Sequence, residues 1–310
     1  MDRDAPDYVQ FYPTLRCNLT CSFCFNRGMP SLPDVAPGDF ERIVSVLSAR
    51  GVGEVDILGG EPTLHPRFGE LMGILCAAEM RTTVSTNGRD VLLLAEVHEK
   101  CGKGLVRVGV SLNSGDIPPA LHQYIVTHMP VCKSVYGRER KIPEAARQYA
   151  SLAGLEYSLL FMDTVTRDDL GNSLPFHEFF RELELFRSRQ GNVNGVFCSG
   201  FLPDSITHPA LERVRCPAGT TKLSVLPDGS VYPCYLLFRY EEFRLGNVLV
   251  NDFDELWRNP RLDFFRRFEG NACPRSGCEL FSRCHGGCPA VSLSVCGDLR
   301  APDPRCVMPR

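Results

Sequence analysis

The clearest indication of the fold is the segment Val9-Gln10-Phe11-Tyr12-Pro13, followed three residues later by Cys17-Asn18-Leu19-Thr20-Cys21-Ser22-Phe23-Cys24. The first part is apolar and aromatic, which predicts a strand. The second part places three cysteines in the loop directly after that strand. In proteins that alternate strands and helices, the loops after the strands form the face where chemistry is done. The sequence therefore predicts a functional site at this loop.

Outward from this segment, strand-like and helix-like stretches alternate. We expect strands at Val55–Leu58, Arg81–Thr86, Val106–Leu112 and Leu155–Met162. We expect helices at Asp39–Ala49, Phe68–Ala78, Val91–Lys100, Pro143–Ala153 and Phe176–Ser188. The stretch after Leu112 is expected to be irregular. This β/α order, repeated about six times, predicts parallel strands with crossover helices: an α/β fold of the partial (β/α)6 TIM-like barrel type.

The regular pattern stops near Gly191, where Gly-, Pro- and Cys-rich segments begin. We therefore expect one domain over residues 1–195 and a linker with a small cysteine-rich domain over residues 196–310. Neither half shows a repeat of fixed period.

Composition excludes several classes of protein. The chain has 310 residues, 44% hydrophobic and 23% charged, with a net charge of −3. This charge gives no excess of basic residues for binding nucleic acid and no polybasic arm for binding membranes, and no apolar run is long enough to span a membrane. The acidic N-terminus does not resemble a secretory signal, so a cytoplasmic location is expected. In a reducing compartment, fifteen cysteines with clustered spacing indicate metal binding rather than disulfides.

The spacing C-x3-C-x2-C at Cys17, Cys21 and Cys24 suits one kind of metal site in particular. Three thiolates can hold three irons of a [4Fe–4S] cluster and leave the fourth iron open, whereas electron-transfer clusters normally take four cysteines. The spacing alone leaves open a zinc site completed by a remote His, or chance.

This motif, with Phe23 just before the third cysteine, resembles the signature of the radical S-adenosylmethionine (SAM) superfamily. The resemblance implies that SAM binds the open iron and is cleaved to a 5′-deoxyadenosyl radical that abstracts hydrogen from a substrate. Other segments agree with the family's SAM contacts, although each alone could be an ordinary turn. By the resemblance, the SAM site comprises Phe23, Gly59, Gly60, Glu61, Ser85, Thr86, Asn87, Ser111 and Asn113. Glu61 is expected to hold the SAM ammonium group, while Asn113 departs from the family's usual Asp.

The C-terminal cysteines resemble the SPASM domain, which binds auxiliary iron–sulfur clusters; a zinc ribbon is the alternative. The pattern reads Cys216, Gly229-x4-Cys234, Cys273, Cys278, Cys284, Cys288 and Cys306. The gap of four residues between Cys273 and Cys278 departs from the usual two. The family's pairing implies an outer cluster on Cys273, Cys278, Cys284 and Cys306, and an inner cluster on Cys216, Cys234 and Cys288. We nominate Cys198 as the fourth inner ligand, which makes three [4Fe–4S] clusters in all; an open inner iron is the alternative.

The resemblance also suggests what the radical modifies. Most SPASM proteins act on peptides, so the leading expectation is an oxidoreductase or maturase that crosslinks or oxidises a ribosomally made peptide. Two sequence features are less typical: the predicted barrel begins too early to leave room for an N-terminal leader-binding domain, and Tyr235 replaces the Asp of sulfatase-maturing enzymes. The alternative is a small-molecule or cofactor-pathway substrate. A non-catalytic iron–sulfur carrier is disfavoured because it has no need of Gly59–Glu61. A donor such as flavodoxin or ferredoxin is expected to supply electrons.

Overall fold

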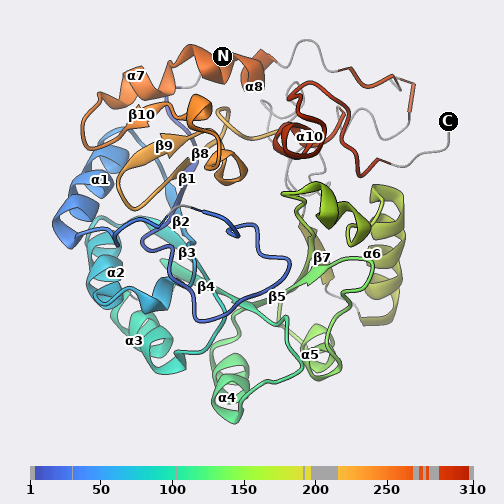
Figure 1. Cartoon of the computed structure of the whole chain (residues 1–310). Coiled ribbons are helices and arrows are strands. Elements are labelled where there is room, and N and C mark those ends of the chain that lie inside the picture. Colours follow the sequence, from blue (N-terminus) through green and yellow to red (C-terminus); the bar gives the residue numbers. More distant parts are fainter. Residues whose placement is uncertain are drawn as a thin grey trace. The chain divides into compact units, whose positions relative to one another are not determined.

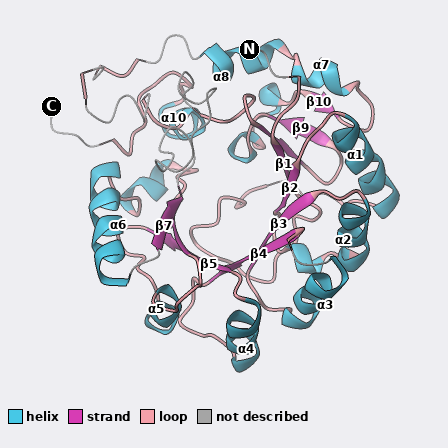
Figure 2. Cartoon of the chain, turned by 180° about the vertical axis from the view of Figure 1, so that it is seen from behind, coloured by secondary structure: helices cyan, strands magenta, loops and turns pink. Residues whose placement is uncertain are grey.

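The computed structural model describes residues 4–29, 31–101, 104–190, 193–196, 216–267, 272–274, 277–278 and 286–306. The chain divides into two compact units, each made from two separate segments. The first unit joins Met1–Val110 to Ala218–Asp263, and the second joins Ser111–Pro217 to Phe264–Arg310. Figure 1 shows the elements coloured along the chain, and Figure 2 shows them from behind.

The first unit is built on parallel strands. Strands β1 (Tyr8–Phe11), β2 (Glu54–Ile57), β3 (Arg81–Thr86) and β4 (Val106–Ser111) pair in chain order, each parallel to the next. Helices α1 (Pro37–Ala49), α2 (Phe68–Ala77) and α3 (Val91–Cys101) connect them and lie along one side of the strands (Figure 1). Each of these strands and helices overlaps the segment predicted from the sequence.

The helices of this unit form because their apolar residues recur at helical spacing. In α1, Phe40, Ile43, Val44 and Leu47 are the buried residues, and Pro37 occupies the first turn, where its missing N–H costs nothing. Helices α2 and α3 are joined by a disulfide between Cys76 and Cys101, with their Cα atoms 5.5 Å apart. This pair is an exception to the expectation from the sequence that the cysteines bind metal rather than form disulfides.

A segment from the C-terminal half completes the first unit. Strand β8 (Lys222–Val225) pairs parallel to β1, on the side opposite β2. It then pairs antiparallel with β9 (Ser230–Tyr232), which pairs antiparallel with β10 (Gly246–Asn247). Asp228 and Gly229 form the turn between β8 and β9, and Gly229 has φ +81° there. Helix α7 (Phe253–Trp257) follows.

The second unit carries three more parallel strands: β5 (Val131–Tyr136), β6 (Tyr157–Phe161) and β7 (Val193–Val196). Its helices are α4 (Pro119–His128), α5 (Glu144–Ala150), α6 (Phe176–Gln190) and α10 (Pro289–Cys296). Helix α8 (Asp263–Arg267) begins at the last residue of the first unit and continues into the second. Both views label these helices together with strands β5 and β7 (Figures 1 and 2).

The expectation of an irregular stretch after Leu112 is wrong, because α4 and β5 lie there. Prolines stand at both ends of α4. Pro119 occupies its first turn, and Met129 ends it in the left-handed conformation at φ 50° just before Pro130. Strand β5 then alternates half-buried and buried residues, the period-2 pattern of a strand.

The α/β class with a mostly parallel sheet is confirmed. The boundary predicted between residues 195 and 196 remains a prediction, and residues 197–215 lie outside the described part of the chain. Within the described residues, none of the helices has the length and hydropathy needed to cross a bilayer.

Candidate iron–sulfur and SAM site

The predicted cluster loop follows β1 directly. Cys17 is exposed, while Cys21 and Cys24 are half-buried. The Cys24 N–H donates to the Cys21 carbonyl at 3.1 Å, and the Leu19 N–H donates to the Cys17 sulfur at 3.4 Å. Burial raises the pKa of the Cys17 thiol; the Leu19 N–H opposes this, and the charges of Glu61, Cys24 and Cys21 raise the pKa further. The three thiols and Glu61 therefore lie within electrostatic range of one another.

The Gly59–Glu61 segment, which follows β2, is bound to the start of this loop by its backbone. The Gly60 N–H donates to the Thr14 carbonyl at 3.0 Å, and the Glu61 N–H donates to the Arg16 carbonyl at 2.7 Å. A Cβ on Gly59 would lie 2.4 Å from the Thr14 oxygen, and one on Gly60 would lie 2.0 Å from the Arg16 oxygen. The two glycines are thus required by the close approach of the chain leading to Cys17.

The Glu61 carboxylate is buried, with 1% of the residue exposed. Its Oε1 accepts from the Thr63 N–H at 3.2 Å, the Thr63 hydroxyl at 2.8 Å and the Thr86 hydroxyl at 2.7 Å. Its Oε2 accepts from the Asn87 N–H at 2.7 Å. Glu61 therefore ties the loop after β2 to the loop after β3, in addition to the SAM contact that the sequence predicts for it.

The remaining predicted SAM contacts of the first unit gather around the same loops. Asn87 donates from Nδ2 to Oδ1 of Asn18, inside the cysteine loop, at 2.7 Å. Phe23 is half-buried beside Cys24, and Ser85 is half-buried on β3. The structure thus brings the loops after β1, β2 and β3 together, as expected for the carboxyl ends of neighbouring parallel strands.

Ser111 and Asn113 are described in the second unit. Ser111 is the last residue of β4 and is half-buried. The Asn113 Oδ1 accepts a hydrogen bond from the Val135 N–H of β5 at 2.8 Å. The side chain of Asn113 therefore supports the backbone of the neighbouring strand, and its predicted contact with SAM remains a prediction.

A contact that sequence reasoning missed joins the cysteine loop to the segment after β9. Tyr235 directly follows Cys234, and its ring packs on Phe25, which directly follows Cys24, with ring centroids 4.6 Å apart. Arg239 donates from Nη2 to the carbonyls of Phe25 and Arg27. No sequence motif predicts these contacts, because they depend on packing between segments distant in sequence.

The C-terminal cysteines differ in burial. Cys216, Cys234 and Cys288 are buried, whereas Cys273, Cys278 and Cys306 are partly exposed. The assignment of these cysteines to an inner and an outer cluster remains a prediction. Cys198 and Cys284 lie outside the described residues.

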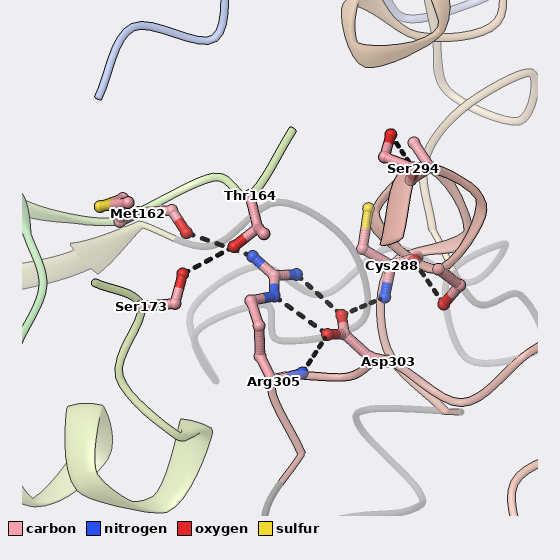
Figure 3. A network of polar contacts seen from close by, with 9 residues as sticks. Met162, Thr164, Ser173, Cys288, Ser294, Asp303 and Arg305 are labelled. Carbon is pink, nitrogen blue, oxygen red and sulfur yellow. Dashed lines mark hydrogen bonds and ion pairs between the residues drawn. The ribbon is translucent and has the colours of Figure 1, made fainter. Parts of the chain in front are cut away.

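Cys288 is held by a buried network in the second unit (Figure 3). It stands at the N-cap of α10, and its N–H donates to Oδ2 of Asp303 at 2.7 Å. Asp303 in turn pairs with Arg305 at 2.8 Å. Burial alone would lower the pKa of Arg305, but the Asp303 carboxylate, with Cys288 and Asp163, raises it above its ordinary value. The Arg305 guanidinium is therefore charged.

The donor chemistry of the loop Cys17–Cys24 fits an iron–sulfur cluster. Its three thiols are the soft ligands that such clusters use, and the neighbouring backbone is fixed by hydrogen bonds. Within the described ranges, no three Cys, His, Asp or Glu side chains converge as they would on a single ion. A cluster does not require that convergence, because each thiolate binds a different iron.

Comparison with known proteins agrees with this geometry. The profile of the Radical SAM superfamily matches residues 11–130, and that of the SPASM iron–sulfur cluster-binding domain matches residues 216–289. The antilisterial bacteriocin subtilosin biosynthesis protein AlbA of Bacillus subtilis is 25% identical over 91% of this chain and 67% of its own. The mycofactocin maturase MftC of Mycobacterium ulcerans is 26% identical over 98% of this chain and 88% of its own.

Solved structures share the fold. Streptococcus suis SuiB bound to S-adenosylmethionine superposes with a TM-score of 0.74 at 20% identity, covering 98% of this chain and 78% of SuiB. SuiB bound to the precursor peptide SuiA gives a TM-score of 0.73 at 19% identity, covering 98% and 76%.

Proposed function

Since this chain belongs to the radical SAM superfamily and carries a C-terminal SPASM domain, we propose that it modifies a ribosomally made peptide by crosslinking or oxidising side chains. When bound, SAM and its [4Fe–4S] cluster supply a 5′-deoxyadenosyl radical, which abstracts hydrogen. The proposal of a peptide substrate is supported by relatives aligned over nearly the whole chain, whose names describe bacteriocin biosynthesis and a maturase. A structural relative is seen bound to a precursor peptide.

The observation that best supports this chemistry is the set of backbone hydrogen bonds that joins the segment leading into the cysteine loop to Gly60 and Glu61. In this proposal Cys17, Cys21 and Cys24 hold the cluster, and the loops after β2 and β3 present the polar groups that orient SAM. Two backbone hydrogen bonds, from Gly60 to Thr14 and from Glu61 to Arg16, hold the segment that leads into the cysteine loop. A segment that is held in place loses less conformational freedom when a ligand binds.

The auxiliary clusters belong to the SPASM domain. We assign the outer cluster to Cys273, Cys278, Cys284 and Cys306, and the inner cluster to Cys216, Cys234 and Cys288, with Cys198 as its fourth ligand. A flavodoxin or ferredoxin supplies electrons, and a cytoplasmic location suits thiolate clusters that need a reducing environment.

The test is anaerobic incubation of the reconstituted enzyme with SAM, dithionite and short peptides encoded beside its gene. Both 5′-deoxyadenosine and peptide mass are measured. We expect 5′-deoxyadenosine above the uncoupled rate and a peptide lighter by the mass of two hydrogens. The control is the variant with Cys17, Cys21 and Cys24 all replaced by Ala, which should form no 5′-deoxyadenosine while keeping its auxiliary clusters.

Two outcomes would contradict the proposal. SAM cleavage at the wild-type rate in the triple variant would contradict the assignment of the SAM-cleaving cluster to Cys17, Cys21 and Cys24. Coupled 5′-deoxyadenosine formation with a small molecule, and with none of the peptides, would replace the peptide by a small-molecule substrate.

A further inference from the structure

Asp303 places a buried negative charge against the loop Gly286–Cys288. Its side chain is 0% exposed. Its Oδ2 accepts from the Cys288 N–H at 2.7 Å, and its own N–H donates to the Gly286 carbonyl at 2.9 Å. A Cβ on Gly287 would lie 2.0 Å from the Asp303 Cβ, so only glycine allows this approach. The carboxylate therefore fixes the backbone from which the Cys288 sulfur projects (Figure 3).

Asp303 also holds a second predicted cluster ligand. Its carbonyl accepts from the Cys306 N–H at 3.0 Å. By the assignment above, Cys288 belongs to the inner cluster and Cys306 to the outer one. A single residue thus contacts the backbone of one ligand from each auxiliary cluster.

Arg305 completes a charge pair that is anchored to the end of β6. Its Nε donates to Oδ1 of Asp303 at 3.0 Å and its Nη2 to Oδ2 at 2.8 Å, a bidentate arrangement. Its Nη1 donates to the Met162 carbonyl at 3.3 Å. The guanidinium lies 4.8 Å from the ring centroid of Phe161 and 5.1 Å from that of Phe176. The pair is therefore rigid, and it links the cysteine segment to the strand.

Stability alone does not explain two full charges at this depth. A buried ion pair can often be replaced by apolar residues of similar volume without loss of stability. Charges in a dry interior act strongly on neighbouring charged groups. The reduction potential of an iron–sulfur cluster depends on the charges, hydrogen bonds and solvent around its ligands.

We propose that Asp303 and Arg305 are positioning residues of the inner auxiliary cluster: they fix Cys288, and their opposite charges set the reduction potential of the cluster that Cys288 ligates. This inference rests on the proposed assignment of Cys288. Because reduction adds negative charge to a cluster, the Asp303 carboxylate lowers its potential and the Arg305 guanidinium raises it.

The experiment measures midpoint potentials of the reconstituted holoenzyme by EPR-monitored redox titration. Asp303→Asn leaves the cation and should shift the potential of one auxiliary cluster upward. Arg305→Gln leaves the carboxylate and should shift the same potential downward. The double variant, Asp303→Asn with Arg305→Gln, restores neutrality and should return toward the wild-type value. A merely structural role would not produce shifts of opposite sign.

Controls separate this inference from its premise. Cys288→Ser should perturb the signal of one auxiliary cluster; an unchanged signal would remove the assignment of Cys288 and the inference with it. Asp169→Asn alters another buried carboxylate of the same unit, which accepts from Val165 and Thr166, and should leave the potentials unchanged.

If Cys288→Ser perturbs the cluster but the two charge variants shift its potential in one direction, or not at all, the inference is overturned. If one of the charge variants fails to fold, Arg305→Lys takes its place, because it keeps the positive charge. We expect its cluster potential to stay near the wild-type value. A downward shift like that of Arg305→Gln would overturn the role of charge.

Discussion

Glu61→Gln is the perturbation that best tests the architecture of the SAM site. The substitution preserves shape but replaces one carboxylate oxygen by an NH2 group. Two of the four groups that Glu61 accepts from are backbone N–H groups, those of Thr63 and Asn87, on opposite oxygens of the carboxylate. Whichever way the amide is turned, its NH2 faces one of these donors. The threonine hydroxyls can rotate, but the backbone N–H cannot.

The magnitude follows from this geometry. One buried, unsatisfied donor costs about 1–3 kcal/mol, and the remaining bonds lose their charge assistance. We expect a total loss of about 2–4 kcal/mol in the free energy of unfolding, or roughly 3–6 °C in Tm. The variant should still fold, because domains have about 5–15 kcal/mol of stability. SAM binding to the reconstituted variant should also weaken, with cluster content unchanged.

The assay is urea unfolding of the cluster-free protein, followed by SAM titration of the reconstituted protein. Glu54→Gln on β2 is the matched control: its carboxylate is 37% exposed and accepts from Thr83 at a long 3.3 Å. It should cost under about 0.5 kcal/mol, as surface substitutions usually do. Equal stability of the two variants would refute the hydrogen-bond argument, and unaltered SAM affinity of Glu61→Gln would refute its role in binding.

Three further predictions test other parts of the chain. Gly60→Ala places a Cβ 2.0 Å from the Arg16 oxygen, so iron analysis should show the loss of about four irons per chain, those of the SAM cluster; full iron content would contradict this. Replacing Cys76 and Cys101 by Ser opens a loop of 25 residues and should lower the free energy of unfolding by about 3.5 kcal/mol in the chain-entropy treatment, measured against oxidised wild type; equal unfolding midpoints would argue against the disulfide. Cys198→Ala should make one auxiliary cluster lose iron faster to a chelator, and identical release kinetics would favour an open inner iron.

The sequence predicted the elements of the first unit well because local patterns specify them. The apolar spacing of α1 and the alternation of the β/α segments determine both type and order. The same local reasoning failed at residues 119–136, which were expected to be irregular. Pro119 starts a helix there, and only the tertiary context distinguishes such a proline from one in a loop.

Motif resemblance named the residues of the candidate site, and their binding roles remain predictions; the contacts that support these residues were not predicted. Motif resemblance named Cys17 and Glu61, yet it could not show that Glu61 joins two loops or that Gly60 is required by the Arg16 backbone. The Tyr235–Phe25 contact and the Asp303–Arg305 pair were missed for the same reason. Both depend on packing between segments distant in sequence, and no fixed spacing of residues in the sequence predicts either contact.

The parallel pairing of β1 with β8 has a consequence for synthesis on the ribosome. Strand β1 is synthesised before β8, and Lys222–Val225 follows it only after about 10–40 s at ordinary translation rates. During that interval one edge of β1 still lacks the β8 strand with which it pairs in the finished protein, and such an edge can recruit strands from other chains. The thiols of Cys17, Cys21 and Cys24 are already present in the nascent chain at this time. Chaperone protection and the timing of iron delivery should therefore matter more for the yield of active enzyme than the stability of the finished fold.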